Sequence, residues 1–235
     1  MADYLPLMTA AVAFAFFVLL AHQYTQRRRM HQLLWTVAML FYSASALMEF
    51  LMNADVSGPS PVLFGIYYAL AAPLVGLLGA GVMYLLAKRT VARFFLGFVV
   101  LFSLALCAAV AVTPLSGATL AESFKGPLAN GFMTASETYP MTVRVFAIVL
   151  NSVGGLILIG GALYSYLRER SRTYNILIAI GGMLPMIGGS ALGLFGYPDA
   201  FFVFELGGTV FLFLGFLFSA RYIGRREATR PLAAR

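Results

Sequence analysis

Charged residues are scarce in this chain of 235 residues, since Asp, Glu, Lys and Arg together make up 11% and hydrophobic residues make up 61%. Soluble globular domains contain about 25% charged and about 45–50% apolar residues. So few charged residues cannot cover a surface that faces water. The composition therefore excludes a soluble enzyme and a disordered protein, and it is typical of a chain that crosses a membrane several times.

Cysteine, histidine and lysine are also rare. The single cysteine, Cys107, excludes an internal disulfide. The two histidines, His22 and His31, flank an arginine cluster outside the apolar runs or at their edge. No histidine pair inside the membrane can therefore ligate haem, and no His/Cys cluster can bind zinc. The last apolar run has no lysine for a retinal Schiff base, and we expect no cofactor and no metal.

Catalytic motifs are missing as well. The chain has no serine or cysteine nucleophile with a matching histidine, and no metalloprotease motif of two histidines flanking a glutamate. We expect no catalytic residue, although an enzyme that uses two carboxylates alone stays open as an alternative.

Seven apolar runs are long enough to cross a bilayer. A hydrocarbon core about 30 Å thick needs roughly 20 residues of helix at about 1.5 Å per residue. The runs cover residues 5–21, 33–52, 62–87, 94–112, 143–167, 176–194 and 201–220. Lipid cannot satisfy backbone polar groups, so each run is expected to be a helix. The sequence predicts one all-α domain, a seven-transmembrane helix bundle that passes repeatedly through the cell membrane.

Positive charge is distributed unevenly along the chain. All but two of the 16 basic residues follow the first, third, fifth or seventh run, and the two exceptions are Lys125 and Arg144. Since cytoplasmic segments carry the excess of Lys and Arg, we expect the N-terminus outside and the C-terminus in the cytoplasm. The net charge of +7 thus reflects topology, and no nucleic-acid partner is expected.

Two segments outside the runs leave alternatives open. Residues 113–140 form the longest outer loop, which either caps the bundle or is a plain crossover. The tail, residues 221–235, either only sets the topology through contact with membrane lipids or meets a cytoplasmic or membrane protein partner. Run one ends much as run five does, and run three ends much as run seven does, which is compatible with a parallel 3+1+3 repeat joined by run four.

Three ionisable residues lie in or at the edge of the runs: Glu49 in the second, Arg144 in the fifth and Glu205 in the seventh. At the bilayer centre such a group costs roughly 2.5–3.5 kcal/mol on insertion scales, and it usually faces the bundle interior. At about 1.5 Å per residue, all three lie within roughly 6 Å of the outer boundary. We predict an outward-facing polar pocket for a small ligand, whose binding residues are Glu49, Tyr68, Arg144, Asn151, Ser190 and Glu205.

The charge of this predicted pocket supports two interpretations. Two carboxylates and one arginine leave one negative charge, which could attract a cation or amine, or hold a proton shared between the carboxylates. Alternatively, Arg144 pairs with one glutamate, while the other glutamate reaches toward the membrane surface and the tyrosines are ordinary interface aromatics.

The stretches Leu34-Trp35-Thr36, Ala46-Leu47-Met48-Glu49-Phe50 and Phe64–Leu78 give the chain a family resemblance. A Trp early in the second run, a Glu late in it and an aromatic start to the third resemble the seven-helix N-terminal input region of some bacterial sensor histidine kinases. In that family an output domain follows the seventh helix, whereas here only Arg221–Arg235 follow. The resemblance implies a sensor whose output passes to a separate protein.

These observations lead to one expected function and two alternatives. We expect a receptor-like, sensory or accessory module that binds a small ligand. The first alternative is a small proton- or ion-coupled transporter, since the architecture also resembles small sugar-transporter folds of the 3+1+3 type. The second is a structural subunit of a larger membrane complex. The uncharged inner halves of the runs favour a one-sided pocket over a continuous path.

Overall fold

The computed structural model describes residues 4–52, 57–113, 115–125, 128–195 and 198–228. Over this part of the chain it forms nine α-helices, which confirms the all-α class. Their bounds are α1 (Leu5–Arg27), α2 (Met30–Leu51), α3 (Pro61–Leu86), α4 (Arg89–Val112), α5 (Gly117–Ser123), α6 (Leu128–Thr138), α7 (Met141–Arg168), α8 (Tyr174–Phe195) and α9 (Pro198–Ala228).

Six of the described helices are long and apolar enough to cross a membrane. They are α1, α2, α3, α4, α7 and the part of α9 from Ala200 to Ser219. This agrees with the predicted multi-pass membrane protein. In α8 the apolar stretch is shorter, Tyr174–Gly189, so the seventh crossing stays a prediction.

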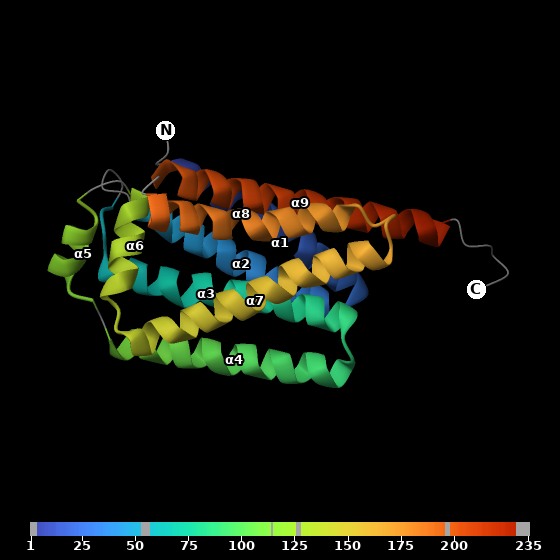
Figure 1. Cartoon of the computed structure of the whole chain (residues 1–235), viewed down its shortest axis with the longest axis horizontal. Coiled ribbons are helices and arrows are strands. Elements are labelled where there is room, and N and C mark those ends of the chain that lie inside the picture. Colours follow the sequence, from blue (N-terminus) through green and yellow to red (C-terminus); the bar gives the residue numbers. More distant parts are fainter. Residues whose placement is uncertain (1–3, 53–56, 114, 126–127, 196–197, 229–235) are drawn as a thin grey trace.

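The long helices form a closed ring in which each packs against the next. The order is α1, α2, α3, α7, α8 and α9, and α9 returns to α1. Helix α4 lies outside this ring, against α3 and α7, and α6 lies across one end of the bundle (Figure 1). The ends of α2 and α8 and the starts of α3 and α9 meet at the end that α6 covers, which brings acidic residues of distant runs together.

Helix α4 presents the most apolar surface to its surroundings. Its buried residues are Ala92, Val99, Leu106 and Val110, which form one narrow stripe, whereas Phe94 is 78% exposed. An apolar helix face of this size is stable in contact with lipid and not with water. Helix α4 therefore lies at the periphery of the described bundle, and its role as the connector between two groups of three helices stays a prediction.

Glycines bring several helix backbones into direct contact. A Cβ atom added at Gly154 of α7 would lie 2.5 Å from the carbonyl oxygen of Val75 in α3. One added at Gly181 of α8 would lie 2.6 Å from the backbone nitrogen of Leu212 in α9. In lipid, where helices gain no hydrophobic attraction for one another, such close approach provides the packing energy of the bundle.

The helix ends follow local signals. Helix α1 ends at a tight turn in which Arg28 adopts a left-handed conformation with φ of 47° and its N–H donates to the carbonyl of Tyr24. Pro61 is the first residue of α3, a position where a backbone N–H would have no partner within the helix, so proline loses no hydrogen bond there. Residues 113–140, predicted as a loop, contain two short helices, and Ser116 caps the first by accepting a hydrogen bond from the Thr119 N–H.

Candidate functional site

Glu49 and Glu205 are buried in the interior of the bundle. Glu49 lies near the end of α2 and is 2% exposed, and Glu205 lies near the start of α9 and is 8% exposed. Because these two helix ends lie at the same end of the ring, both side chains line one cavity.

The cavity has a volume of about 310 Å³ and lies between α2, α3, α7, α8 and α9. This volume falls at the lower end of the roughly 300–1,000 Å³ found for small-molecule sites. Most of its walls are apolar, and a few polar side chains gather near the glutamates. The polar lining residues are Tyr42, Ser45, Glu49, Tyr67, Asn151 and Glu205.

The polar lining residues lie close together. The Glu49 and Glu205 carboxyl groups are neighbours, and the Tyr67 hydroxyl lies near Glu49. The hydroxyl groups of Tyr42 and Thr209 donate to the backbone carbonyl of Glu205, at 3.3 and 2.9 Å. Two neighbouring carboxylates in an apolar interior repel each other. We therefore expect the pair to hold at most one negative charge.

One oxygen of each carboxyl group lacks a partner. Oε2 of Glu49 and Oε2 of Glu205 are both buried, and neither accepts a hydrogen bond from any described group. Leaving a buried polar atom unpaired costs about 1–3 kcal/mol, and more for a charged group. Two unpaired acceptor atoms beside one cavity are expected where a ligand supplies the missing hydrogen-bond donors.

An apolar extension continues the cavity away from the glutamates. A second, smaller space of about 20 Å³ shares Leu78, Leu158 and Leu212 with the cavity and ends between Trp35 and Phe216. The Trp35 and Phe216 rings meet edge to face at 5.7 Å, and the Trp35 Nε1–H donates to the carbonyl of Leu78 at 3.1 Å. The space is therefore polar at one end and apolar at the other.

Two of the lining residues are exposed, and they mark the opening of the cavity. These are Asn151 on α7 and Met186 on α8, the latter 49% exposed. At about 1.5 Å per residue, Asn151 lies about 15 Å from the start of α7, which is about a third of the way along that helix. The opening thus lies on the side of the bundle between α7 and α8.

Aromatic side chains close the end of the bundle next to the glutamates. The Tyr67 ring lies 4.7 Å from Phe132 of α6, and the Tyr68 ring lies 5.0 Å from Tyr139. Phe132 and Tyr139 are buried, and Phe64 stacks against both. Burial, with Tyr68 close by, raises the pKa of the Tyr139 hydroxyl above its usual value. Of the two alternatives for residues 113–140, the contacts of α6 fit a cap.

The structure brings three of the six predicted site residues to the cavity, namely Glu49, Asn151 and Glu205. Tyr68 and Arg144 do not line it. Arg144 is partly exposed on α7, its charge lies close to Tyr68, and no ion pair joins it to either glutamate. Among the described residues, the alternative pairing of Arg144 with a glutamate is therefore not present. Ser190 belongs to α8, but its side chain lies outside the described part of the chain.

The sequence-based site left out Tyr42, Ser45 and Tyr67. Tyr42, Ser45 and Glu49 follow one another in steps of three and four residues, so they share one face of α2. This helical spacing could have identified Tyr42 and Ser45 as site residues. Tyr67 directly precedes Tyr68, and consecutive side chains of a helix differ in direction by about 100°. Tyr67 therefore lines the cavity, whereas Tyr68 does not.

Comparison of the chain with protein-family models, curated proteins and solved structures gives no match. The chemistry of the site therefore has to be argued from its own residues. Among the described residues, no group of three or more His, Cys, Asp or Glu side chains could hold a metal ion. The cavity offers two carboxyl groups, two phenol groups, one hydroxyl and one amide to a ligand.

Proposed function

We propose that this chain is a receptor-like or accessory membrane module that binds a small ligand in the cavity beside Glu49 and Glu205. The observation that carries the proposal is the pair of buried carboxyl groups, each with one unpaired oxygen, on a cavity of about 310 Å³. Burying two acidic groups inside an apolar bundle is costly, and such groups are by default functional candidates in a membrane protein.

Two features favour a binding module over a transporter. The apolar extension ends at Trp35 and Phe216, and neither offers a polar path toward the other end of the bundle. At the opposite end, Phe132 of α6 covers Tyr67. A transported solute needs polar access from both sides, whereas a ligand that is only sensed or held needs access from one.

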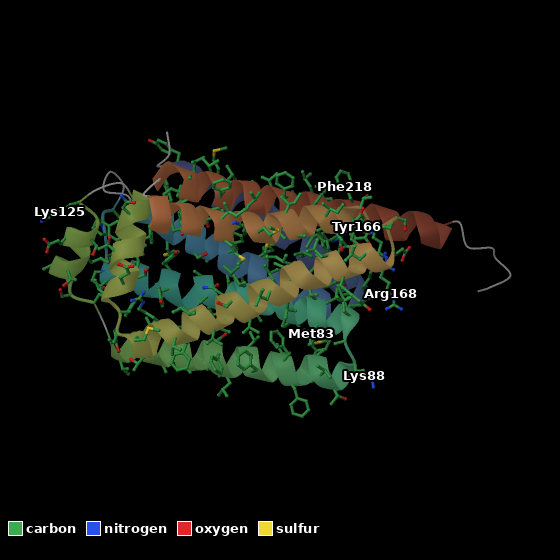
Figure 2. The ribbon with its side chains drawn as sticks, viewed as in Figure 1. Met83, Lys88, Lys125, Tyr166, Arg168 and Phe218 are labelled. Carbon is green, nitrogen blue, oxygen red and sulfur yellow. The ribbon has the colours of Figure 1, made fainter. Side chains whose placement is uncertain are left out.

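We further propose seven crossings, with the N-terminus outside and the C-terminus in the cytoplasm. The neighbour order supports the 3+1+3 repeat, because α1–α2–α3 and α7–α8–α9 pack alike and join through α3–α7 and α9–α1. The two lysines provide a test, because Lys88 and Lys125 lie at opposite ends of the bundle (Figure 2).

In right-side-out vesicles, a membrane-impermeant amine reagent is expected to modify Lys125 and to leave Lys88 unmodified. Both side chains are exposed, so only the membrane separates them from the reagent. Mass spectrometry of the two peptides, before and after the vesicles are opened, measures the result. Modification of Lys88 in sealed vesicles would contradict the proposed orientation.

Glu49→Gln and Glu205→Gln are each expected to release a ligand that co-purifies with the wild-type chain. A charge-assisted hydrogen bond contributes about 1.5–3 kcal/mol, so the retained ligand should fall by about tenfold or more. The measurement is mass spectrometry of small molecules extracted from equal amounts of folded protein.

Glu122→Gln is the matched control for this experiment. Glu122 lies on α5, its carboxylate is exposed and 3.6 Å from the Lys125 ammonium, and it is not among the residues that line the cavity. This variant should keep the ligand content of the wild type. Equal ligand content in all four proteins would contradict a role for the buried carboxyl groups in binding.

A further inference from the structure

The cavity provides acceptors but no positive charge. None of its lining residues is Lys, Arg or His, and Arg144 points elsewhere. The unpaired oxygens of Glu49 and Glu205 therefore need hydrogen-bond donors from outside the chain. Because the two carboxyl groups line one apolar cavity, where two neighbouring negative charges repel, we expect the pair to hold at most one negative charge, which matches a ligand with one positive charge.

A bare metal ion does not fit this environment. Calcium takes about 6–8 oxygen ligands and magnesium about six in near-octahedral order. The polar groups gather near the glutamates, while the rest of the wall consists mainly of aliphatic side chains and glycines. An organic cation needs only one or two acceptors for its head and apolar walls for the remainder.

The apolar walls define the body of the ligand. Leu74, Val75 and Leu78 of α3 face Leu158 of α7 and Leu212 of α9 across the cavity. The smaller space next to the cavity extends this apolar lining toward Trp35. A ligand whose head lies at the glutamates therefore has its body among aliphatic side chains, where each buried methylene group adds to its affinity.

The opening of the cavity also points to a ligand that dissolves in the bilayer. Its exposed lining residues, Asn151 and Met186, lie on the side of the bundle, while α6 covers the end next to the glutamates. About a third of the way along a membrane-spanning helix, this side faces hydrocarbon. The Asn151 amide makes no hydrogen bond within the described part of the chain, so it can bind a polar head that passes it.

We propose that the ligand is a lipophilic amine, a molecule with one ammonium head and an apolar body. The head donates hydrogen bonds to the free oxygens of Glu49 and Glu205, and the body lies along the apolar walls toward Trp35. This assignment rests on the proposed function, because it names the chemical class of the ligand for the same cavity.

The only tryptophan of the chain reports on the far end of the site, which makes a direct test available. The probe is hexadecylamine with bromine on its terminal carbon, added to the protein in phosphatidylcholine nanodiscs. Bromine quenches tryptophan fluorescence on contact. Hexadecanol with the same bromine is the matched control, because it partitions into the disc and lacks the cationic head.

The amine is expected to quench Trp35 at a concentration at least about tenfold lower than the alcohol, because only the amine forms a charge-assisted hydrogen bond. The Glu49→Gln/Glu205→Gln double variant should lose this difference. Butylamine, which has the head without the body, should fail to displace the probe even at about a hundredfold excess, because it buries little apolar surface.

Two glycine variants separate specific from general quenching. Gly155→Leu fills the cavity from α7 and should abolish quenching by the amine, whereas Gly160→Leu, in open space on the same helix, should leave it unchanged. Equal quenching by amine and alcohol, both lost in Gly155→Leu, would overturn the amine and keep the ligand cavity. Equal quenching by both probes in every variant, or by neither, would contradict the proposed function as well. If Gly155→Leu does not fold, the glutamate double variant decides between amine and alcohol.

Discussion

Gly154→Leu is expected to prevent the chain from forming a stable bundle. At this position α7 crosses α3 so closely that a Cβ atom would lie 2.5 Å from the carbonyl oxygen of Val75 and 2.8 Å from the Cα of Gly76. Both contacts are with backbone, which cannot rotate away as a side chain would. Helix α3 also packs against α2 and α4, so it has no free direction in which to move.

The expected cost exceeds the usual range for overpacking. Inserting methyl or methylene groups into a packed core costs about 1–3 kcal/mol, and here a whole side chain must displace a backbone. We expect little monodisperse protein in detergent and a large fall in Tm for any that is recovered. Gly79→Leu should behave alike, because a Cβ atom there would lie 2.8 Å from the Gly154 carbonyl oxygen.

Gly160→Leu is the matched control on the same helix. A Cβ atom at Gly160 meets nothing within 4 Å, and the residue is exposed on the outside of α7. Leucine also has a higher helix propensity than glycine, which is roughly 0.8–1 kcal/mol less favourable than alanine in a helix interior. The control should therefore match or exceed the Tm of the wild type. If Gly154→Leu were as stable as Gly160→Leu, the close α3–α7 contact would be absent in the protein.

The helices themselves could be predicted from the sequence, because long apolar runs admit few other structures in lipid. Their ends could not. The first run was placed at residues 5–21, whereas α1 continues to Arg27. Hydropathy detects only the part of a helix that lies in hydrocarbon, while polar residues such as Gln23 and Gln26 continue the same hydrogen-bond pattern beyond it.

The cap over the bundle was not predictable in detail. Residues 128–138 form α6, and the local sequence pattern alone does not require a helix there. Ring contacts of Phe132 with Tyr67 and of Tyr139 with Phe64 hold this segment against α3. Such tertiary contacts join residues that lie more than 60 positions apart in the sequence. The sequence therefore left open whether this segment covers the bundle or simply crosses it.

The helix end at which each residue lies could be predicted, but the direction of each side chain could not. Glu49 and Glu205 lie near helix ends on the same side of the ring and line one cavity. Arg144 lies near the start of α7, yet its side chain lies near Tyr68 and does not line the cavity. Which helices are neighbours decides which of these groups meet, and this order comes from close contacts such as the one between Gly181 and Leu212.

The central claim is that Glu49 and Glu205 form one acidic pair that shares a proton on a cavity inside the membrane. Dicyclohexylcarbodiimide tests it directly, because this apolar reagent dissolves in the bilayer and adds to a carboxyl group that carries a proton. The other acidic residues of the chain lie outside the predicted spans, where a water-soluble carbodiimide reaches them. Intact-protein and peptide mass spectrometry give the number and the position of the adducts.

We expect one adduct per chain from the apolar reagent, located on Glu49 or Glu205 and never on both, because the pair shares one proton and the first adduct fills the cavity. The Glu49→Gln/Glu205→Gln double variant should show none, and the water-soluble reagent should modify neither residue. Two adducts on the same chain, or modification of these residues by the water-soluble reagent, would contradict the claim that the two carboxyl groups meet inside the membrane.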